Sequence, residues 1–394
     1  DEHYFSGDIQ SDIALLNITH ARADFSAAAP EYQADFKASL QKIRPISELD
    51  LGKASLSAEV KLRGNQVYHH SAHVNLLVDS LIYKGYSYRD IGLTGTLDRG
   101  LFEAQIRSLD TNILVNLTAS GSLSEKEHSI HLGMDLNSID LYALHLFHEA
   151  FRVKSNASVD IEIYDENDFN INARIPRMDF SFSDTLYEMH PISLAFASGP
   201  SKTDLTLESY FYNFHGSIND HVLNALDAIR HMPGYYLAEA GRDSTRSPLP
   251  DFQMEGKLDY PEAFARIFSP VLPAFKTLTL NGMNDKKNDL FFIDLSVPGL
   301  RYNSVFADST SLRVIGDSKE LQFQVQADFG IDGLMNGMLR FQGFSKGAEL
   351  ISNLRYEDSF SNQYINLTSQ LSSSDTGIML RILPDSLTFS YEQW

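Results

Sequence analysis

The histidine cluster His69, His70 and His73 is the nearest approach to a metal-ligand set in the sequence. Imidazole nitrogens are common ligands of zinc and other transition metals. His70 and His73 are three residues apart and precede an expected strand near Val74–Leu76, where positions i and i+3 point to opposite faces. At this spacing the two histidines cannot bind the same metal ion from one strand, and we expect neither a metal site nor a cofactor.

Two other clusters carry metal-ligating atoms without completing a site. His145 and His148 are three residues apart in an expected helix and have no third ligand near them in the sequence. The run 165–168 offers carboxylate and amide oxygens, but it lacks the spacing and the final bidentate Glu of an EF-hand calcium loop. We interpret the histidines as surface residues and the acidic run as a solvated hairpin turn between two strands.

Catalytic motifs of defined spacing are absent from the sequence. It contains no glycine-rich phosphate loop, no G-x-S-x-G elbow, no H-E-x-x-H pair and no cysteine. With 52 acidic residues, pairs of carboxylates are too frequent to indicate a glycosidase. Tyr210, Tyr212 and the pair 235–236 could stack on sugar rings, but packing at strand edges is the simpler interpretation. We therefore expect a protein that is not an enzyme.

Composition narrows the class of partner. The 394 residues carry a formal net charge of −20, which argues against nucleic acid and against an anionic membrane surface, because both require clustered Lys and Arg. Hydrophobic residues make up 43% of the chain, so it can bury enough apolar surface to fold. No run of about 18 apolar residues predicts a helix that crosses a bilayer.

Alternation of apolar and polar residues predicts β strands over most of the chain. From Ile91 onward, apolar residues occupy one parity of each run and polar residues occupy the other, with period two. Gly, Asp and Asn fill connections such as 98–100 and 109–112, as tight hairpin turns require. The strands recur at intervals of roughly ten to fifteen residues. The sequence thus predicts a mainly β fold, a long antiparallel meander with one face exposed to solvent.

Three short helical insertions are expected, near residues 138–150, 219–232 and 261–269. The first is predicted from apolar residues spaced by three and four. The second follows Asn219, a plausible N-cap, and should stop at Pro233. The third is bounded by Pro261 and Pro270. Helices this sparse cannot cover the apolar face of so many strands.

That apolar face needs a partner, which a second sheet, closure into a barrel or folding into an open trough would supply. Sandwiches of this length normally divide into domains of about 100 residues. Only residues 242–248 resemble a linker. We therefore expect one continuous, elongated open trough, made of segments 1–242 and 249–394, and cut from a longer chain.

Three stretches of the sequence resemble a known family. Residues 83–100, with their spaced Tyr and Gly, residues 261–282 and the closing residues 383–394 are similar to TamB and AsmA-like proteins of the double-membrane bacterial envelope. The resemblance covers nearly the whole chain through short motifs. It implies a trough-shaped sheet with an apolar interior, located in the periplasm and anchored to the inner membrane by a helix outside this sequence.

The family resemblance also implies a function. The family is linked to phospholipid movement between the inner and outer membranes, and to assembly or secretion of outer-membrane proteins with a barrel partner. Each acyl methylene exposed to water costs about 0.8 kcal/mol, so an apolar trough could carry phospholipid acyl chains without a chemical step. The expected lining residues are Leu93, Leu97, Phe102, Ile106, Val115, Leu117, Leu132, Ile161, Ile171, Phe180, Phe323, Val325 and Leu380.

Other interpretations stay open at this point. Each lining residue could belong to an ordinary core, because alternation indicates burial and does not show what covers the residue. The protein could be a scaffold for outer-membrane proteins, pairing its strand edges with incoming strands. It could also be a periplasmic or extracellular β-sandwich that binds glycans.

Overall fold

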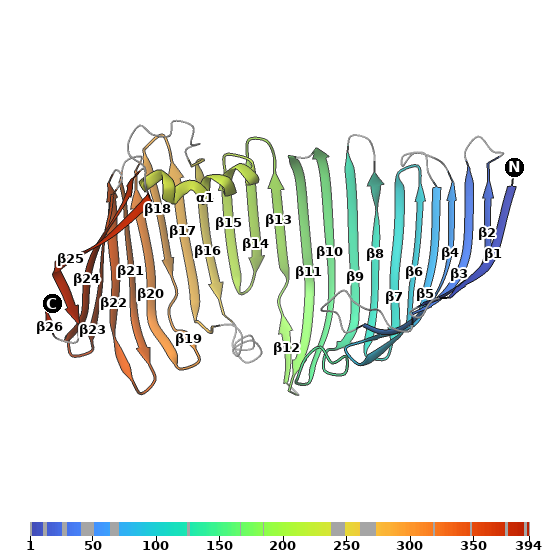
Figure 1. Cartoon of the computed structure of the whole chain (residues 1–394), viewed down its shortest axis with the longest axis horizontal. Coiled ribbons are helices and arrows are strands. Elements are labelled where there is room, and N and C mark those ends of the chain that lie inside the picture. The colour runs from blue at the N-terminus through green and yellow to red at the C-terminus, as the bar shows by residue number, and fades with distance from the viewer. Residues whose placement is uncertain are drawn as a thin grey trace. The chain divides into compact units, whose positions relative to one another are not determined.

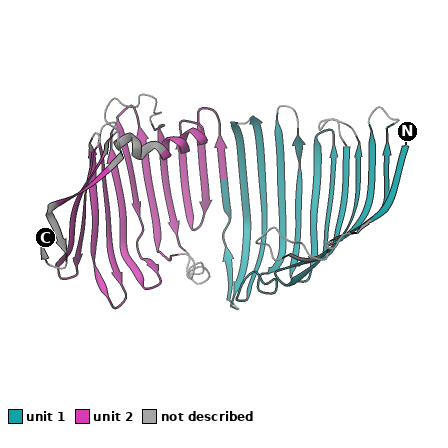
Figure 2. Cartoon of the chain, viewed as in Figure 1, with its two compact units in different colours: residues 1–194 teal, residues 195–394 magenta. Residues whose placement is uncertain are grey.

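The chain consists mainly of antiparallel β strands in the computed structural model (Figure 1). The model describes residues 2–10, 14–25, 30–40, 51–63, 71–123, 127–165, 167–183, 185–237, 249–260, 273–317, 320–346, 349–374, 377–389 and 392–393. They fall into two compact units, residues 1–194 and 195–394 (Figure 2). The expected linker at 242–248 lies outside the described residues.

Unit 1 is an antiparallel meander in which each strand pairs with the next one along the chain. Its strands are β1 (Glu2–Gln10), β2 (Ala14–Asp24), β3 (Glu31–Leu40), β4 (Leu51–Arg63), β5 (Ser71–Tyr83), β6 (Tyr86–Asp98), β7 (Leu101–Asp110), β8 (Ile113–Leu123), β9 (His128–Asp140), β10 (Phe151–Asp165), β11 (Asp168–Phe182) and β12 (Thr185–Met189). In the described pairings β1 joins β2 alone, so the sheet is open. The division between the units falls within β13 (Ile192–Ser198).

Unit 2 continues the same antiparallel pattern and carries one helix in its described part. Its elements are β14 (Thr203–Ser209), β15 (Tyr212–Ile218), α1 (Val222–Leu237), β16 (Phe252–Asp259), β17 (Thr277–Asp285), β18 (Leu290–Ser296), β19 (Leu300–Tyr302), β20 (Val305–Gly316), β21 (Glu320–Ile331), β22 (Met335–Lys346), β23 (Glu349–Asp358), β24 (Gln363–Ser374), β25 (Gly377–Phe389) and β26 (Glu392–Gln393). β18 and β19 both pair with β20. The prediction of a mainly β antiparallel meander is confirmed.

Few large side chains are fully buried in either unit. Leu144 is the largest described side chain with no exposed surface, and much of the remaining apolar core consists of alanines. The chain exposes 24503 Å², whereas two compact globular units of half its mass would expose about 19,000 Å² together. The excess indicates sheets whose faces are incompletely covered.

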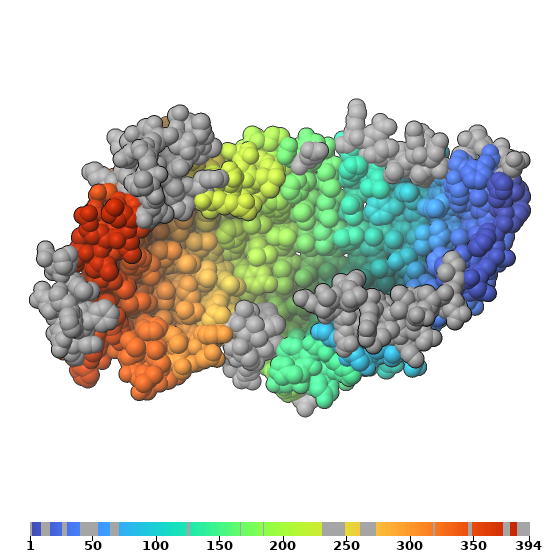
Figure 3. Space-filling view, in the orientation of Figure 1, coloured from blue at the N-terminus to red at the C-terminus, as the bar shows by residue number. Residues whose placement is uncertain are grey.

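The expected helix near 219–232 is confirmed as α1, with shifted bounds. The Leu223 amide donates to Nδ1 of His221 over 3.3 Å, so the cap lies after Asn219. Pro233 does not end the helix, which continues to Leu237. Its buried face consists of small residues, Ala225 and Ala228. Figures 1 and 3 show α1 across the upper ends of strands in unit 2, with the strand surface recessed below it.

The prediction of a helix near 138–150 is wrong. Residues 138–140 continue β9, because Ile139 pairs with Ile113 on one side and with Val153 on the other. A tight turn follows, in which the Leu144 amide donates to the Asp140 carbonyl over 3.0 Å. His145 then has a φ of 59°, a left-handed conformation that stops helix propagation. The regular spacing of leucines here reflects a single turn that buries Leu144.

The third expected helix, near 261–269, lies outside the described residues. The expected hairpin at 165–168 is confirmed, because β10 ends at Asp165 and β11 begins at Asp168. The Asn167 amide donates to Oδ1 of Asp165 over 2.6 Å, which is typical of such turns.

The turn between β6 and β7 depends on a glycine, and two alanine substitutions test this. Gly100 has a φ of 85°, and a Cβ added there would lie 2.5 Å from the Leu123 carbonyl oxygen. Gly100→Ala should lower the free energy of unfolding by about 1–3 kcal/mol. Gly92→Ala in β6, where a Cβ meets nothing within 4 Å, should not lower it. Urea unfolding measures both, and equal losses would contradict the turn geometry.

Candidate functional site

Strand register brings apolar residues of unit 1 into rows that cross the sheet. The best-defined row runs from β2 to β9, and each member pairs directly with the next. It consists of Ile18, Phe36, Ala58, Leu76, Leu93, Ile106, Leu117 and Met134. Since strands are about 4.8 Å apart, the row is about 34 Å long. One face of unit 1 is thus apolar over many consecutive strands.

All the predicted lining residues of unit 1 lie on this apolar face. Two of them are in the same strand at odd and even positions, which in a regular strand would point to opposite faces. Ile171 and Phe180 belong to the same strand, β11, at odd and even positions. Ile171 pairs with Ile161, and Phe180 pairs with Val153. The register shift between Asn156 and Ser158 accounts for the change of parity, because a bulge moves the later residues to the other side of the strand.

Unit 2 has an apolar face of its own. Leu312, Val325, Phe341, Leu354 and Leu367 form a row from β20 to β24, each paired with the next. Predicted residue Phe323 precedes Val325 by two positions on the same face, and its ring centroid lies 5.1 Å from that of Phe341. Predicted residue Leu380 pairs with Leu371, which lies on the same face of β24.

The apolar faces retain contact with solvent. Leu380 is 64% exposed, and most other predicted lining residues are half-buried. Phe180, at 5% exposure, is the predicted residue that belongs to a closed core. The core interpretation therefore applies to Phe180, and the other side chains belong to apolar faces, one in each unit, that the described residues cover only in part.

Two phenylalanines on these faces lie across glycines of the neighbouring strand. A Cβ added to Gly121 would be 2.7 Å from Cε1 of Phe102, and one added to Gly343 would be 2.7 Å from Cζ of Phe323. Each glycine leaves the space that the ring occupies, as aromatic residues do over glycines in designed sheets. The rings therefore lie along the sheet and fill the surface instead of standing away from it.

These glycines and the part of the apolar row before Ile91 were not predicted from the sequence. The available signals were a glycine opposite a phenylalanine in hairpin register and the alternation within residues 51–63 and 71–83. Neither signal shows which strands are neighbours. Only the register of strand pairing shows that the apolar residues of separate strands form one surface.

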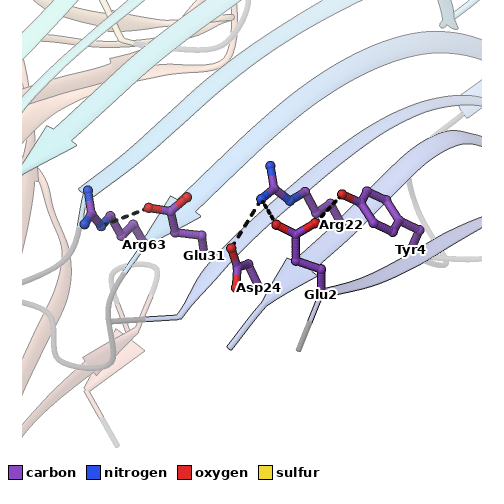
Figure 4. A network of polar contacts seen from close by, with 6 residues as sticks. All are labelled: Glu2, Tyr4, Arg22, Asp24, Glu31 and Arg63. Carbon is purple, nitrogen blue, oxygen red and sulfur yellow. Dashed lines mark hydrogen bonds and ion pairs between the residues drawn. The ribbon is translucent and has the colours of Figure 1, made fainter. Parts of the chain in front are cut away.

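The opposite face of unit 1 is polar. Glu59, Asn75, Thr94, Gln105 and Thr118 form a row in register, one position away from the apolar row. Ion pairs occupy its end near β1, as Figure 4 shows for the contacts of Arg22 with Glu2 (2.7 Å) and Asp24 (3.2 Å). Exposed pairs of this kind contribute little to stability, because water and salt screen them. This face is polar, whereas the opposite face is apolar.

The histidines do not gather. His73 is exposed on the polar face, whereas His69 and His70 lie outside the described residues. Nδ1 of His145 contacts the Lys84 carbonyl oxygen at 3.0 Å, and Nε2 of His148 lies 3.7 Å from Glu149. The part of the chain that the structure describes contains no group of three side chains able to hold a metal ion.

Comparison of the chain with protein-family models, with curated proteins and with solved structures finds no match. Among the described residues, no helix has the length and hydropathy needed to span a membrane. The two apolar faces are therefore the features that bear most directly on function.

Two phenylalanines of unit 2 test whether the apolar face is a core. Phe341 is 37% exposed, and Phe291 in β18 is 2% exposed. Phe291→Ala should cost about 3–5 kcal/mol of unfolding free energy, as in a closed core, and Phe341→Ala about 1–2 kcal/mol. Urea unfolding of both variants compares the costs. An equal cost would mean that the face carrying Phe341 is sealed.

Proposed function

We propose that the apolar faces of the two units hold the acyl chains of phospholipids while the head groups stay in water. The observation that carries this proposal is the run of half-buried apolar side chains in register across consecutive strands. Each acyl methylene transferred from water to such a surface gains about 0.8 kcal/mol. The surface thus lowers the cost of moving a lipid outside a bilayer.

The dimensions of the unit 1 face suit an acyl chain. One leaflet contributes about half of the ~30 Å hydrocarbon core, or about 15 Å per tail. The row from Ile18 to Met134 is about twice that length, given the usual strand spacing. A tail could therefore move along the row without leaving apolar contact.

Acyl chains fit this face better than a polypeptide does. The N–H and C=O groups of interior strands are used by the neighbouring strands, so the face offers few hydrogen bonds. A peptide laid on it would leave its own backbone groups unpaired, and each buried unpaired group costs about 1–3 kcal/mol. A hydrocarbon tail has no such groups.

The proposal includes the wider role of TamB and AsmA-like proteins. On this account each sheet curls into a trough, and the protein is periplasmic, anchored to the inner membrane and engaged in lipid transport toward the outer membrane. Support comes from the antiparallel meander and from the Tyr and Gly pattern of residues 83–100. Lipid transfer needs no catalytic group, since it is driven by a difference in lipid concentration or by an external source of free energy.

A scaffold for outer-membrane proteins, acting with a barrel partner, is the second candidate function. It is favoured by the edge of β1, whose side chains Tyr4 and Phe5 are exposed. Edge strands of this kind can add a further strand. A glycan-binding sandwich has less support, because a second sheet would bury the apolar face that the described residues leave half-buried.

Lipid retention tests the main proposal. The protein, purified without detergent, should release phospholipid in about stoichiometric amount on solvent extraction and mass spectrometry. Leu93→Asp and Phe323→Asp should each reduce the amount severalfold, because a carboxylate on the apolar face is costly beside a tail. Thr94→Asp and Gln324→Asp place the same charge one residue away on the polar face and should retain lipid.

Circular dichroism establishes that each variant is folded before extraction. A folded wild-type protein without lipid would overturn the proposal, as would equal lipid loss in the polar-face controls. If the apolar-face variants retain as much lipid as the wild type, the lipid binds somewhere other than the apolar faces.

A further inference from the structure

Two neighbouring hairpins of unit 2 enclose a pocket of about 500 Å³. They are the turns between β21 and β22 and between β23 and β24, at the lower ends of these strands in Figure 1. Gly337 pairs with Asp358, and the Ser359 amide donates to the Asn336 carbonyl over 3.2 Å, so the hairpins are joined by backbone contacts. The pocket is therefore built from regular secondary structure.

Aromatic side chains dominate the pocket. Tyr356, Phe360 and Tyr364 line it, and the rings of the two tyrosines have centroids 6.0 Å apart at 43°. Phe360 and Leu334, at the tips of the two turns, are 84% and 81% exposed. Turn tips normally carry polar residues or glycine, so apolar side chains at both tips need an explanation other than the turn itself.

Tyr356 contributes a hydroxyl without a protein partner. The residue is 5% exposed, and its hydroxyl has no hydrogen bond within the described residues. Burial raises the pKa of Tyr356, so the hydroxyl is protonated at neutral pH. A buried donor without an acceptor costs about 1–3 kcal/mol.

One carboxylate lines the pocket. Oδ1 of Asp358 accepts hydrogen bonds from the amides of Phe360 (2.9 Å) and Asn362 (2.8 Å), and Oδ2 accepts one from Nδ2 of Asn362 (2.8 Å). Burial raises the pKa of Asp358, but these hydrogen bonds, together with one from the Tyr364 side chain, outweigh it and hold the pKa below its usual value. The carboxylate is ionised at neutral pH, and the residues lining the pocket include no basic side chain.

We infer that this pocket binds the ammonium head group of a zwitterionic phospholipid. Aromatic faces together with a carboxylate are the usual surroundings of an alkylammonium ion, and the same carboxylate repels an anionic head. Tyr356 lines the same pocket and adds a second aromatic face beside that of Tyr364. The inference rests on the proposed function, since it assigns a head-group site to the lipid whose tails lie on the apolar face.

The pocket is continuous with the apolar face of unit 2. Tyr356 follows Leu354 by two positions in β23 and pairs with Leu339, so its ring lies on the same face as the row through Phe341 and Leu354. A lipid with its head at Asp358 can thus extend its tail along that row. Head and tail then meet chemically different parts of one surface.

Two amphiphiles with the same tail test the head-group site. Dodecylphosphocholine and dodecyl phosphate differ by the ammonium group, and binding of each to the whole chain is measured by calorimetry below its micelle concentration. The phosphocholine should bind about tenfold more tightly. Asp358→Asn should abolish this preference, because it removes the charge and keeps the side-chain shape.

Asp332→Asn is the matched control, since Asp332 lies in the adjoining turn, loses the same charge and does not line the pocket. Tyr364→Leu provides a second test should Asp358→Asn perturb the turn, and it should also reduce the preference. Equal binding of the two amphiphiles, or equal effects of Asp358→Asn and Asp332→Asn, would overturn the head-group site and leave the apolar face standing. If neither amphiphile binds, both the head-group site and the proposed function are overturned.

Discussion

The antiparallel hydrogen-bond ladder is the constraint on which the rest of the structure depends. Each interior strand satisfies its backbone groups with two neighbours, so a sheet can grow strand by strand without a second layer. Growth of this kind leaves two faces whose chemistry is decided by residue parity alone. One face can be hydrated, and the other must find an apolar partner. In both units the described residues supply that partner only in part.

On the proposed function, this constraint allows an apolar face to hold a lipid tail without catalytic machinery. A surface formed by Leu93, Ile106 and Leu117 in register offers a tail nearly uniform contact, so no single position traps it. Phe102 and Phe323 preserve this uniformity, because their rings lie across glycines of the adjacent strand. If the ligand is a phospholipid, as we propose, specificity comes from its polar end. The pocket around Asp358 is a site of suitable chemistry at the border of the apolar face.

Much of the fold follows from local patterns. Alternation places Leu93 and Thr94 on opposite faces before any partner strand is known, and the turn residues of 98–100 separate two strands. Patterns failed where tertiary contacts decide the outcome. Leu144 has helical spacing from its neighbours, yet residues 138–140 stay in β9 because strands on both sides bind them. The pocket could not be predicted, since Leu334 and Tyr364 meet only after two hairpins pair.

The most direct test of the central claim is where a bound tail lies. Intermolecular nuclear Overhauser effects between the mid-chain methylenes of a bound phospholipid and assigned methyl groups of the protein report contacts at atomic range. We expect contacts to the methyls of Leu93 and Leu117, and none to those of Thr94 and Thr118 on the opposite face. Contacts confined to the threonine methyls, or no contacts to the leucines in the lipid-bound protein, would contradict it.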